Sequence, residues 1–351
     1  MPIGAMTPKQ RFDAACRHQP VDRPPVWLMR QAGRYMAEYR AVRARHSLLE
    51  ICRTPALAAA VTITAAERLG VDAAIIFADL LLPAEPLGLK LEFLAGEGPK
   101  LEPALRTPAQ IAALPETWGG RLGYVSEAIA LVHRHFEGRL PVLGFAGAPF
   151  TLASYLIEGG GSRHYAATKG LMYSQPDAWD ELMAKLVSAL SGFLAEQAQA
   201  GAAALQLFDS WAGALSETDY RRYVLPHNQR LVAAAQALGI PAIYFSTGTS
   251  AYLETLAETG AQVLSLDWRI DLATAWRRLE RLPGPMPVLQ GNLDPLLLLA
   301  PPEVLRHAVA VMLRQAAPHP GYIFNLGHGI LPETPVDNVT ALVEQIANTA
   351  G

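Results

Sequence analysis

The chain has 351 residues, of which 51% are apolar and 17% charged, with 29 Lys plus Arg against 32 Asp plus Glu. This composition supplies a large hydrophobic core and excludes an intrinsically disordered protein. The net charge of -3 and the lack of a long basic run argue against nucleic-acid binding. Any affinity for an anionic ligand must therefore be local.

The cysteines and the N-terminus indicate where the protein works. Only Cys16 and Cys52 occur, and neither belongs to a Cys-x-x-Cys pair, which argues against a disulfide scaffold and against a structural zinc site. Residues 1–11 contain no apolar signal core, and no run of about 18 apolar residues is present. We therefore expect a cytoplasmic protein without a membrane partner, in which the short leucine-rich segments 80–82 and 296–299 are buried.

Apolar runs bounded by Gly, Pro or Asp recur along the chain and are typical of parallel strands buried on both faces. We predict eight strands, at 26–29, 73–79, 140–147, 204–210, 241–247, 263–268, 287–294 and 322–329. Segments with helical spacing lie between the strands, for example at 177–199, 273–282 and 302–316.

The regular alternation of strand and helix favours an α/β fold, a (β/α)8 TIM barrel that forms a single domain over residues 1–351. The chain shows no long linker and no shift in composition. A Rossmann fold would need Gly-x-Gly-x-x-Gly after the first strand, and the chain has Arg30-Gln31-Ala32-Gly33-Arg34 there instead. We expect residues 1–25 to form a short N-terminal arm and the Pro-rich segment 99–115 to be an insertion.

Active sites of barrels lie at the carboxyl ends of the strands, where the loops converge. Two cations, Arg30 and Arg34, follow the first predicted strand and are four residues apart. They repel each other unless anions compensate them, and bidentate pairing with ligand carboxylates would do so. The alternative is an internal ion-pair network with Glu38 or Glu50. Arg40 and Arg43 extend the same cationic stretch.

Asp79 ends an otherwise apolar strand, and the loop that follows it offers no positive partner. A carboxylate in such surroundings is costly unless a ligand donates hydrogen bonds or a positive charge to it, which favours a catalytic role over turn capping. Two other carboxylates at strand ends, Asp267 and Asp294, are better explained as caps of the next turn or helix.

Three further polar side chains follow predicted strands. His328 lies between Gly327 and Gly329, which imply a crowded or positive-φ backbone that aims the imidazole at the mouth. Ser210 has two possible roles, donation to a ligand carboxylate or capping of the next helix. Tyr155 follows a glycine-containing strand and is either a ligand contact or part of the core.

The sequence lacks the patterns of several other chemistries. No Ser-His-Asp constellation, Gly-x-Ser-x-Gly motif or Walker motif is readable, and no lysine falls at a strand end where a Schiff base would be expected. The candidate site therefore combines arginines, one carboxylate, hydroxyls and an imidazole, and we expect no metal and no tethered cofactor.

Four long motifs together resemble the uroporphyrinogen decarboxylase family. They are segments 23–35, 74–79, 144–152 together with Tyr155 and Glu158-Gly159-Gly160, and 324–329 (Phe324-Asn325-Leu326-Gly327-His328-Gly329). The resemblance covers nearly the whole chain. It implies a homodimeric barrel enzyme of tetrapyrrole synthesis that removes carbon dioxide from the four acetate side chains of uroporphyrinogen III and gives coproporphyrinogen III.

By motif, the resemblance places the family's functional residues on this chain. It implies catalytic roles for Asp79 and Arg30 and a further mouth arginine at Arg43. Trp211 stands where some members have His after the serine, so we expect Trp211 only to pack. The substrate contacts that the resemblance implies are Arg30, Gln31, Ala32, Gly33, Arg34, Asp79, Tyr155, Ser210 and His328.

Two alternatives compete with this assignment. A zinc-dependent methyltransferase of the same barrel superfamily would need His and Cys ligands, and both cysteines lie before the second predicted strand. A non-catalytic tetrapyrrole carrier would use the same cationic mouth without turnover.

Overall fold

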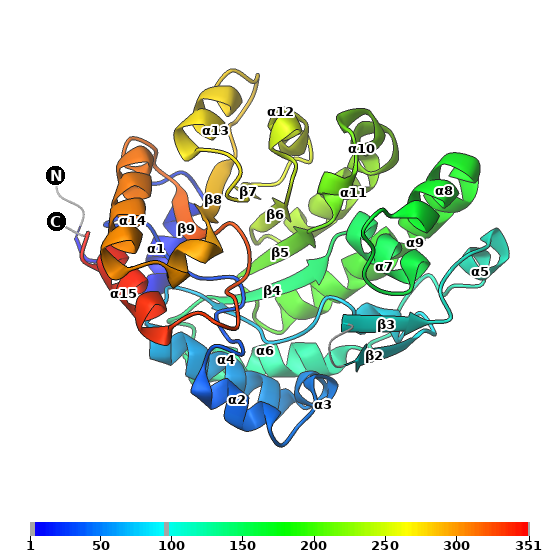
Figure 1. Cartoon of the computed structure of the whole chain (residues 1–351), viewed down its shortest axis with the longest axis horizontal. Coiled ribbons are helices and arrows are strands. Elements are labelled where there is room, and N and C mark those ends of the chain that lie inside the picture. Colours follow the sequence, from blue (N-terminus) through cyan, green and yellow to red (C-terminus); the bar gives the residue numbers. More distant parts are fainter. Residues whose placement is uncertain (1–3, 95–97, 350–351) are drawn as a thin grey trace.

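The computed structural model describes residues 4–94 and 98–349, and its centre is a curled sheet of seven parallel strands in the order β1-β4-β5-β6-β7-β8-β9 (Figure 1). This arrangement confirms the predicted parallel α/β barrel. The strands of this sheet are β1 (Ala74–Ile75), β4 (Val142–Gly147), β5 (Ala204–Asp209), β6 (Ala242–Ser246), β7 (Val263–Ser265), β8 (Val288–Leu293) and β9 (Tyr322–Leu326).

The segment at residues 25–29 closes the barrel between β9 and β1. Val26 forms a parallel bridge with Phe324, and the Val26 carbonyl accepts from Asp72 N–H at 2.7 Å. Our prediction of a full strand here was wrong in detail. Pro25 has no N–H to donate, while the N–H groups of Leu28 and Met29 donate to side-chain oxygens of Gln31 and Asn325 instead of to a neighbouring strand.

Helices surround the strands and connect each one to the next (Figure 1). The predicted helices at 177–199, 273–282 and 302–316 correspond to α9, α13 and α14. The helices are α1 (Pro8–Ala15), α2 (Ala37–Arg43), α3 (Leu48–Arg53), α4 (Pro55–Leu69), α5 (Pro108–Ala112), α6 (Gly123–His135), α7 (Pro149–Glu158), α8 (Ala166–Ser174), α9 (Pro176–Gln199), α10 (Glu217–Tyr223), α11 (Leu225–Gln236), α12 (Leu253–Ala257), α13 (Leu272–Leu279), α14 (Pro302–Ala316) and α15 (Val336–Ala347), with short 3-10 helices η1 (Leu82–Ala84), η2 (Ala212–Ala214), η3 (Ser250–Tyr252) and η4 (Pro295–Leu299).

The strands bury both faces, as their continuous hydrophobicity predicted. Alternate residues point in opposite directions, so one set packs against the helices while the other fills the barrel. The interior set includes Trp27, Leu143, Ile243 and Ile323, all fully buried. The barrel is therefore packed below the mouth, and a ligand has room only at the end where the loops converge.

Two expectations about loops need correction. The predicted insertion begins earlier than residue 99, because it includes an antiparallel hairpin of β2 (Lys90–Leu94) and β3 (Gly98–Glu102) before α5. The segment 296–299 is not buried throughout, since Leu296 is 57% and Leu299 43% exposed while Leu298 is fully buried. A single turn of η4 directs only one of these three leucines inward.

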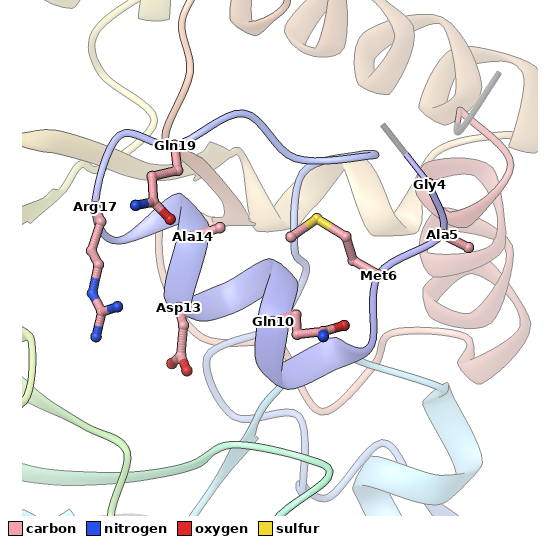
Figure 2. Close-up of a pocket in the computed structure, with 8 residues that line it drawn as sticks. All are labelled: Gly4, Ala5, Met6, Gln10, Asp13, Ala14, Arg17 and Gln19. Atoms are coloured by element: carbon pink, nitrogen blue, oxygen red, sulfur yellow. The ribbon is translucent and has the colours of Figure 1, made fainter. Parts of the chain in front are cut away.

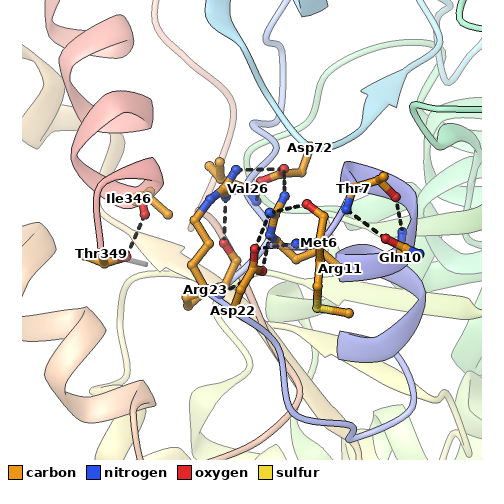
Figure 3. A network of polar contacts seen from close by, with 11 residues as sticks. Met6, Thr7, Gln10, Arg11, Asp22, Arg23, Val26, Asp72, Ile346 and Thr349 are labelled. Carbon is orange, nitrogen blue, oxygen red and sulfur yellow. Dashed lines mark hydrogen bonds and ion pairs between the residues drawn. The ribbon is translucent and has the colours of Figure 1, made fainter. Parts of the chain in front are cut away.

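The N-terminal arm is tied to the seam of the barrel by buried ion pairs (Figure 3). Arg11 donates to both oxygens of Asp22 at 2.7 Å and to Asp72 at 2.7 Å, and Arg23 pairs with Asp72 at 2.6 Å. Asp72 also accepts from the Val26 N–H at 2.9 Å. The arm and the closing segment are therefore linked through one carboxylate.

None of the helices formed by residues 4–94 and 98–349 is both long and apolar enough to cross a membrane.

Candidate active site at the barrel mouth

Arg30 begins the loop that follows the closing segment, and its backbone is in the left-handed region with φ of 60°. The aliphatic stem of Arg30 lies directly over Gly329, where an added Cβ would come within 2.4 Å of Cδ. The guanidinium is exposed and makes no ion pair or hydrogen bond with residues 4–94 or 98–349. Gly329 thus provides the space for the Arg30 side chain, whose guanidinium is unpaired within the described residues.

The next residues present backbone donors rather than side chains. Gln31 is buried, and its side-chain amide bonds Leu28 N–H and the Ala73 carbonyl, so the side chain itself stabilises the seam. The N–H groups of Ala32, Gly33 and Arg34 have no partner among the described residues. Consecutive free N–H groups beside a guanidinium suit a carboxylate ligand.

The alternative ion-pair network of the arginine loop does not form in the described chain. Glu50 caps Ser47 at the start of α3, and Glu38 lies 3.8 Å from Arg68. Arg34 is exposed, and the Arg40 guanidinium holds the carbonyls of Arg34 and Tyr35 at 2.9 and 2.7 Å.

Arg43, the further arginine that the resemblance pointed to, lies at the end of α2. It is exposed and donates to the His46 carbonyl. The charge of Arg34 is therefore available to a ligand, whereas Arg40 fixes the backbone around Arg34 and Arg43 bonds the backbone of His46.

Asp79 lies in the loop after β1 and is partly buried. One carboxylate oxygen accepts from the Leu81 N–H at 2.8 Å, and no bond to the other oxygen is present within the described residues. Burial raises the pKa of Asp79, against the opposing effects of the Leu81 N–H and the positive charge of Arg30. Asp79 therefore does cap a turn, but it keeps one oxygen for a ligand and lies close to Arg30.

Tyr155 of α7 belongs to an aromatic cluster at the mouth. Its ring stacks on Trp211 with 3.7 Å between centroids, and Tyr165 meets Trp211 edge-on at 5.0 Å. Burial and then the negative charge of Asp79 raise the pKa of Tyr155 to about 12, while Arg30 lowers it. The phenol is thus neutral and near both Asp79 and Arg30, and Trp211 packs as expected.

Ser210 follows β5, and its side chain caps no helix. The neighbouring Asp209 is fully buried and accepts from Thr151, Tyr244 and Asn228 at 2.8, 2.7 and 3.1 Å. Burial raises the pKa of Asp209, which is opposed by these three donors. The Asp209 network fixes the end of β5, and the Ser210 hydroxyl makes no hydrogen bond within the described residues.

His328 lies in the loop after β9, pressed between its neighbours. An added Cβ on Gly327 would come within 2.4 Å of the Trp268 nitrogen, so the flanking glycines do reflect crowding, and neither has a positive φ. The His328 pKa is lowered to about 4, first by burial and then by the charges of Arg30 and Arg269. The imidazole is therefore neutral at pH 7.

The two carboxylates that we expected to act as caps do so. Asp267 accepts from Gly248 N–H at 2.7 Å and Arg269 N–H at 3.1 Å, and Asp294 accepts from Leu296 N–H at 2.9 Å. These bonds confirm the structural interpretation of both residues.

Sequence reasoning missed the aromatic floor of the mouth. The rings of Phe145, Phe208 and Phe245 contact one another edge-on at 5.6 and 5.7 Å, and Phe245 reaches His328 at 6.3 Å. The sequence does show one Phe in each of three predicted strands. Only closure of the barrel shows that these three side chains point inward and meet. Such a floor offers apolar contacts to individual aromatic rings of a ligand.

Two other surface hollows lie away from these residues. Figure 2 shows one beside α1, lined by residues that include Gln10, Asp13 and Arg17; α1 covers the opposite, amino-terminal end of the barrel. The second lies between the β2–β3 hairpin and the end of α7. Within the described ranges, no three His, Cys, Asp or Glu side chains are grouped so that they could hold a metal ion.

An α/β barrel whose mouth groups a carboxylate, an aromatic floor and arginines that are unpaired within the described residues is typical of barrel enzymes that bind anionic ligands. The family model described as Uroporphyrinogen decarboxylase (URO-D) matches residues 7–349. The chain belongs to the uroporphyrinogen decarboxylase family.

Individual relatives agree with the family model. The uroporphyrinogen decarboxylase of Koribacter versatilis is 56% identical over 338 residues, covering 96% of this chain and 95% of that protein. The one from Solibacter usitatus is 50% identical over 346 residues and covers 99% of both chains. Among solved structures, a methyltransferase from Methanosarcina mazei has a TM-score of 0.78 at 20% identity, covering 98% of this chain and 99% of that one, which supports the fold alone.

Proposed function

We propose that this protein decarboxylates uroporphyrinogen III, converting its four acetate side chains to methyl groups and releasing coproporphyrinogen III for tetrapyrrole synthesis. The observation that carries the proposal is the grouping of Asp79, Arg30 and Tyr155 at one end of the barrel. One oxygen of Asp79 and the whole guanidinium of Arg30 are free of partners in the described residues. The substrate offers complementary groups, pyrrole N–H donors at its centre and carboxylates at its rim.

Each decarboxylation needs a place for the electron pair of the broken C–C bond. Protonation of a pyrrole carbon makes the ring cationic, and the ring then receives that pair as carbon dioxide leaves. A second proton completes the methyl group, and loss of the first restores the pyrrole. The substrate is its own electron sink, which explains why the chemistry needs no pyridoxal or thiamine.

The protein's residues serve this step through charge and position. Asp79 accepts from the pyrrole N–H groups and stabilises the cationic ring, and its partial burial strengthens that interaction. Arg30 holds the reacting acetate and takes part in proton delivery. Tyr155 and Ser210 orient the macrocycle over the phenylalanine floor, and the remaining contacts come from Arg34, His328 and the backbone of residues 31–33.

The two cysteine thiols do not favour the alternative of a zinc-dependent methyltransferase. Burial raises the pKa of the thiols of Cys16 and Cys52, which disfavours the thiolates that zinc requires. Cys16 also packs in the barrel interior cluster near the amino-terminal end.

We also propose that the protein is a cytoplasmic homodimer in which each chain folds as a single domain. The free cysteines suit a reducing compartment. Exposed Leu296, Leu299 and Val304 lie on one short stretch after β8 and offer an apolar surface for a second copy. Light scattering after gel filtration tests the dimer, and a monomer at micromolar concentration contradicts it.

Turnover tests the function. The purified protein is incubated with uroporphyrinogen III under reducing, metal-free conditions, and products are separated by carboxylate number. We expect seven-, six-, five- and finally four-carboxylate species. Binding without any loss of carboxylates by folded protein would support a tetrapyrrole carrier and reject the enzyme.

A further inference from the structure

Arg269 follows β7 and lowers the pKa of His328, but it is not among the substrate contacts proposed above. We propose that Arg269 is a further carboxylate-binding cation of the mouth, which holds a side-chain carboxylate of the tetrapyrrole beside His328. This inference rests on the proposed function, because it assigns one more contact to the same substrate.

Neighbouring residues fix the Arg269 guanidinium in place. Its Nη1 pairs with the buried Asp267 at 2.6 Å, and Asp267 also holds the Arg269 N–H at 3.1 Å. The guanidinium carbon lies 4.1 Å above the Trp268 ring, a cation–π contact. An arginine restrained in this way loses little side-chain entropy when it binds a carboxylate.

The loop that carries Arg269 packs against the loop that carries His328. The rings of Trp268 and His328 meet edge-on at 6.4 Å, and the Trp268 backbone leaves no room for a side chain at Gly327. The charges of Arg269 and Arg30 both act on the His328 ring. Arg269 therefore belongs to the same mouth as Arg30 and Asp79.

The guanidinium keeps donors for a ligand. Within the described chain, Nη1 is the only guanidinium nitrogen of Arg269 that makes a hydrogen bond, so Nε and Nη2 are free there. The Arg269 side chain is 48% exposed. Asp267 is the acidic partner of Arg269, whereas Arg30 has none among residues 4–94 and 98–349. Among the described residues Asp267 is thus the one carboxylate paired with these two cations, and a substrate carboxylate compensates the remaining positive charge.

Steady-state decarboxylation of uroporphyrinogen III by Arg269→Gln, Arg269→Lys and wild type tests the inference. We expect Arg269→Gln to raise KM about tenfold with kcat within twofold, because a uniform binding contact is lost. Arg269→Lys keeps the charge and recovers most of the KM. Arg277→Gln is the matched control, since Arg277 is an exposed arginine of α13 that bonds only Thr274 in the described structure, and its KM should not change.

An unchanged KM in Arg269→Gln overturns the inference, as does an equal rise in Arg277→Gln or a fall in kcat without a change in KM. The melting temperature of each variant separates an effect on binding from an effect on folding. If Arg269→Gln melts at a lower temperature than wild type, Arg269→Lys provides the test instead, and its KM must stay within about threefold of the wild-type KM. Absence of turnover in wild type would reject the proposed function instead, so the two failures are distinguishable.

Discussion

At the residue scale, the carboxylates at the strand ends illustrate how similar positions acquire different roles. Asp267 and Asp294 use their oxygens on backbone N–H groups, as their sequence positions indicated. Asp79 and Asp294 each use only one oxygen in this way among the described residues, and Asp79 is the one that lies near Arg30. The sequence identified the unusual apolar surroundings of Asp79, but the free oxygen could be seen only in the folded chain.

Asp79→Asn tests this distinction between the carboxylates. The amide preserves size but removes the negative charge that we propose stabilises the protonated ring, so we expect kcat to fall roughly 100-fold or more with the same melting temperature. Asp294→Asn, which still accepts from Leu296 N–H, should stay within about threefold of wild type. Similar losses in both variants would mean that Asp79 is only a cap.

His328 gives a prediction for stability against pH. Its folded pKa of about 4 lies below the unfolded value of about 6.5, so the unfolded chain binds the proton more tightly. The contribution of the neutral ring to the free energy of unfolding is fully present above pH 6.5 and is lost as the pH falls toward 4. This loss is at most ~3 kcal/mol, because the ring is only partly buried. The groups that act on it are Arg30 and Arg269, which lower the pKa, and Asp267, which raises it.

Urea unfolding of wild type and His328→Gln between pH 7 and pH 4 measures this effect. As the pH falls, the free energy of unfolding of wild type should decrease more than that of His328→Gln, because glutamine does not titrate in this range. Any stability advantage of wild type should therefore shrink or reverse. A constant difference over this range would show that the imidazole is not desolvated in the folded protein.

At the scale of elements, the loops after the closing segment and after β9 form one unit. The Ile330 N–H donates to the Met29 carbonyl at 3.0 Å, and the Arg30 stem covers Gly329. The sequence indicated separately that the arginine loop and the Gly-His-Gly motif matter. Their contact depends on barrel closure, which brings together segments about 300 residues apart in the chain.

Gly329→Ala tests this contact without changing a charged group. The backbone at Gly329 is not in the positive-φ region, so alanine is tolerated there, but its methyl group would displace the flexible Arg30 stem. We expect kcat/KM to fall roughly 10- to 100-fold with the melting temperature nearly unchanged. Gly170→Ala on the exposed face of α8, where no atom lies within 4 Å, is the control and should keep full activity. Full activity in Gly329→Ala would mean that Arg30 acts from another position.

At the scale of the whole molecule, barrel closure depends on a carboxylate outside the site. Asp72 is 1% exposed and joins Arg11, Arg23 and the Val26 N–H in the cluster of Figure 3. The charges of the two arginines are balanced there by Asp72 and Asp22. Loss of one carboxylate leaves a buried cation without its partner, which is costly.

Asp72→Asn should therefore destabilise the protein by about 3 to 5 kcal/mol, measured as the free energy of unfolding in urea. Asp13→Asn breaks the exposed pair with Lys9 and should change stability by less than about 1 kcal/mol. Equal, small effects in both variants would show that the buried cluster does not hold the seam.

The sequence by itself determined the class of fold, because strands buried on both faces must be apolar throughout and their alternation with helices permits few topologies. It also determined the family, through long motifs around Arg30, Asp79, Tyr155 and His328. Tertiary structure alone decided how the barrel closes, since side chains of Gln31, Asn325 and Asp72 replace strand hydrogen bonds there. It alone placed Arg269 beside His328, because contacts between loops that are distant in sequence depend on packing in three dimensions, which no local pattern encodes.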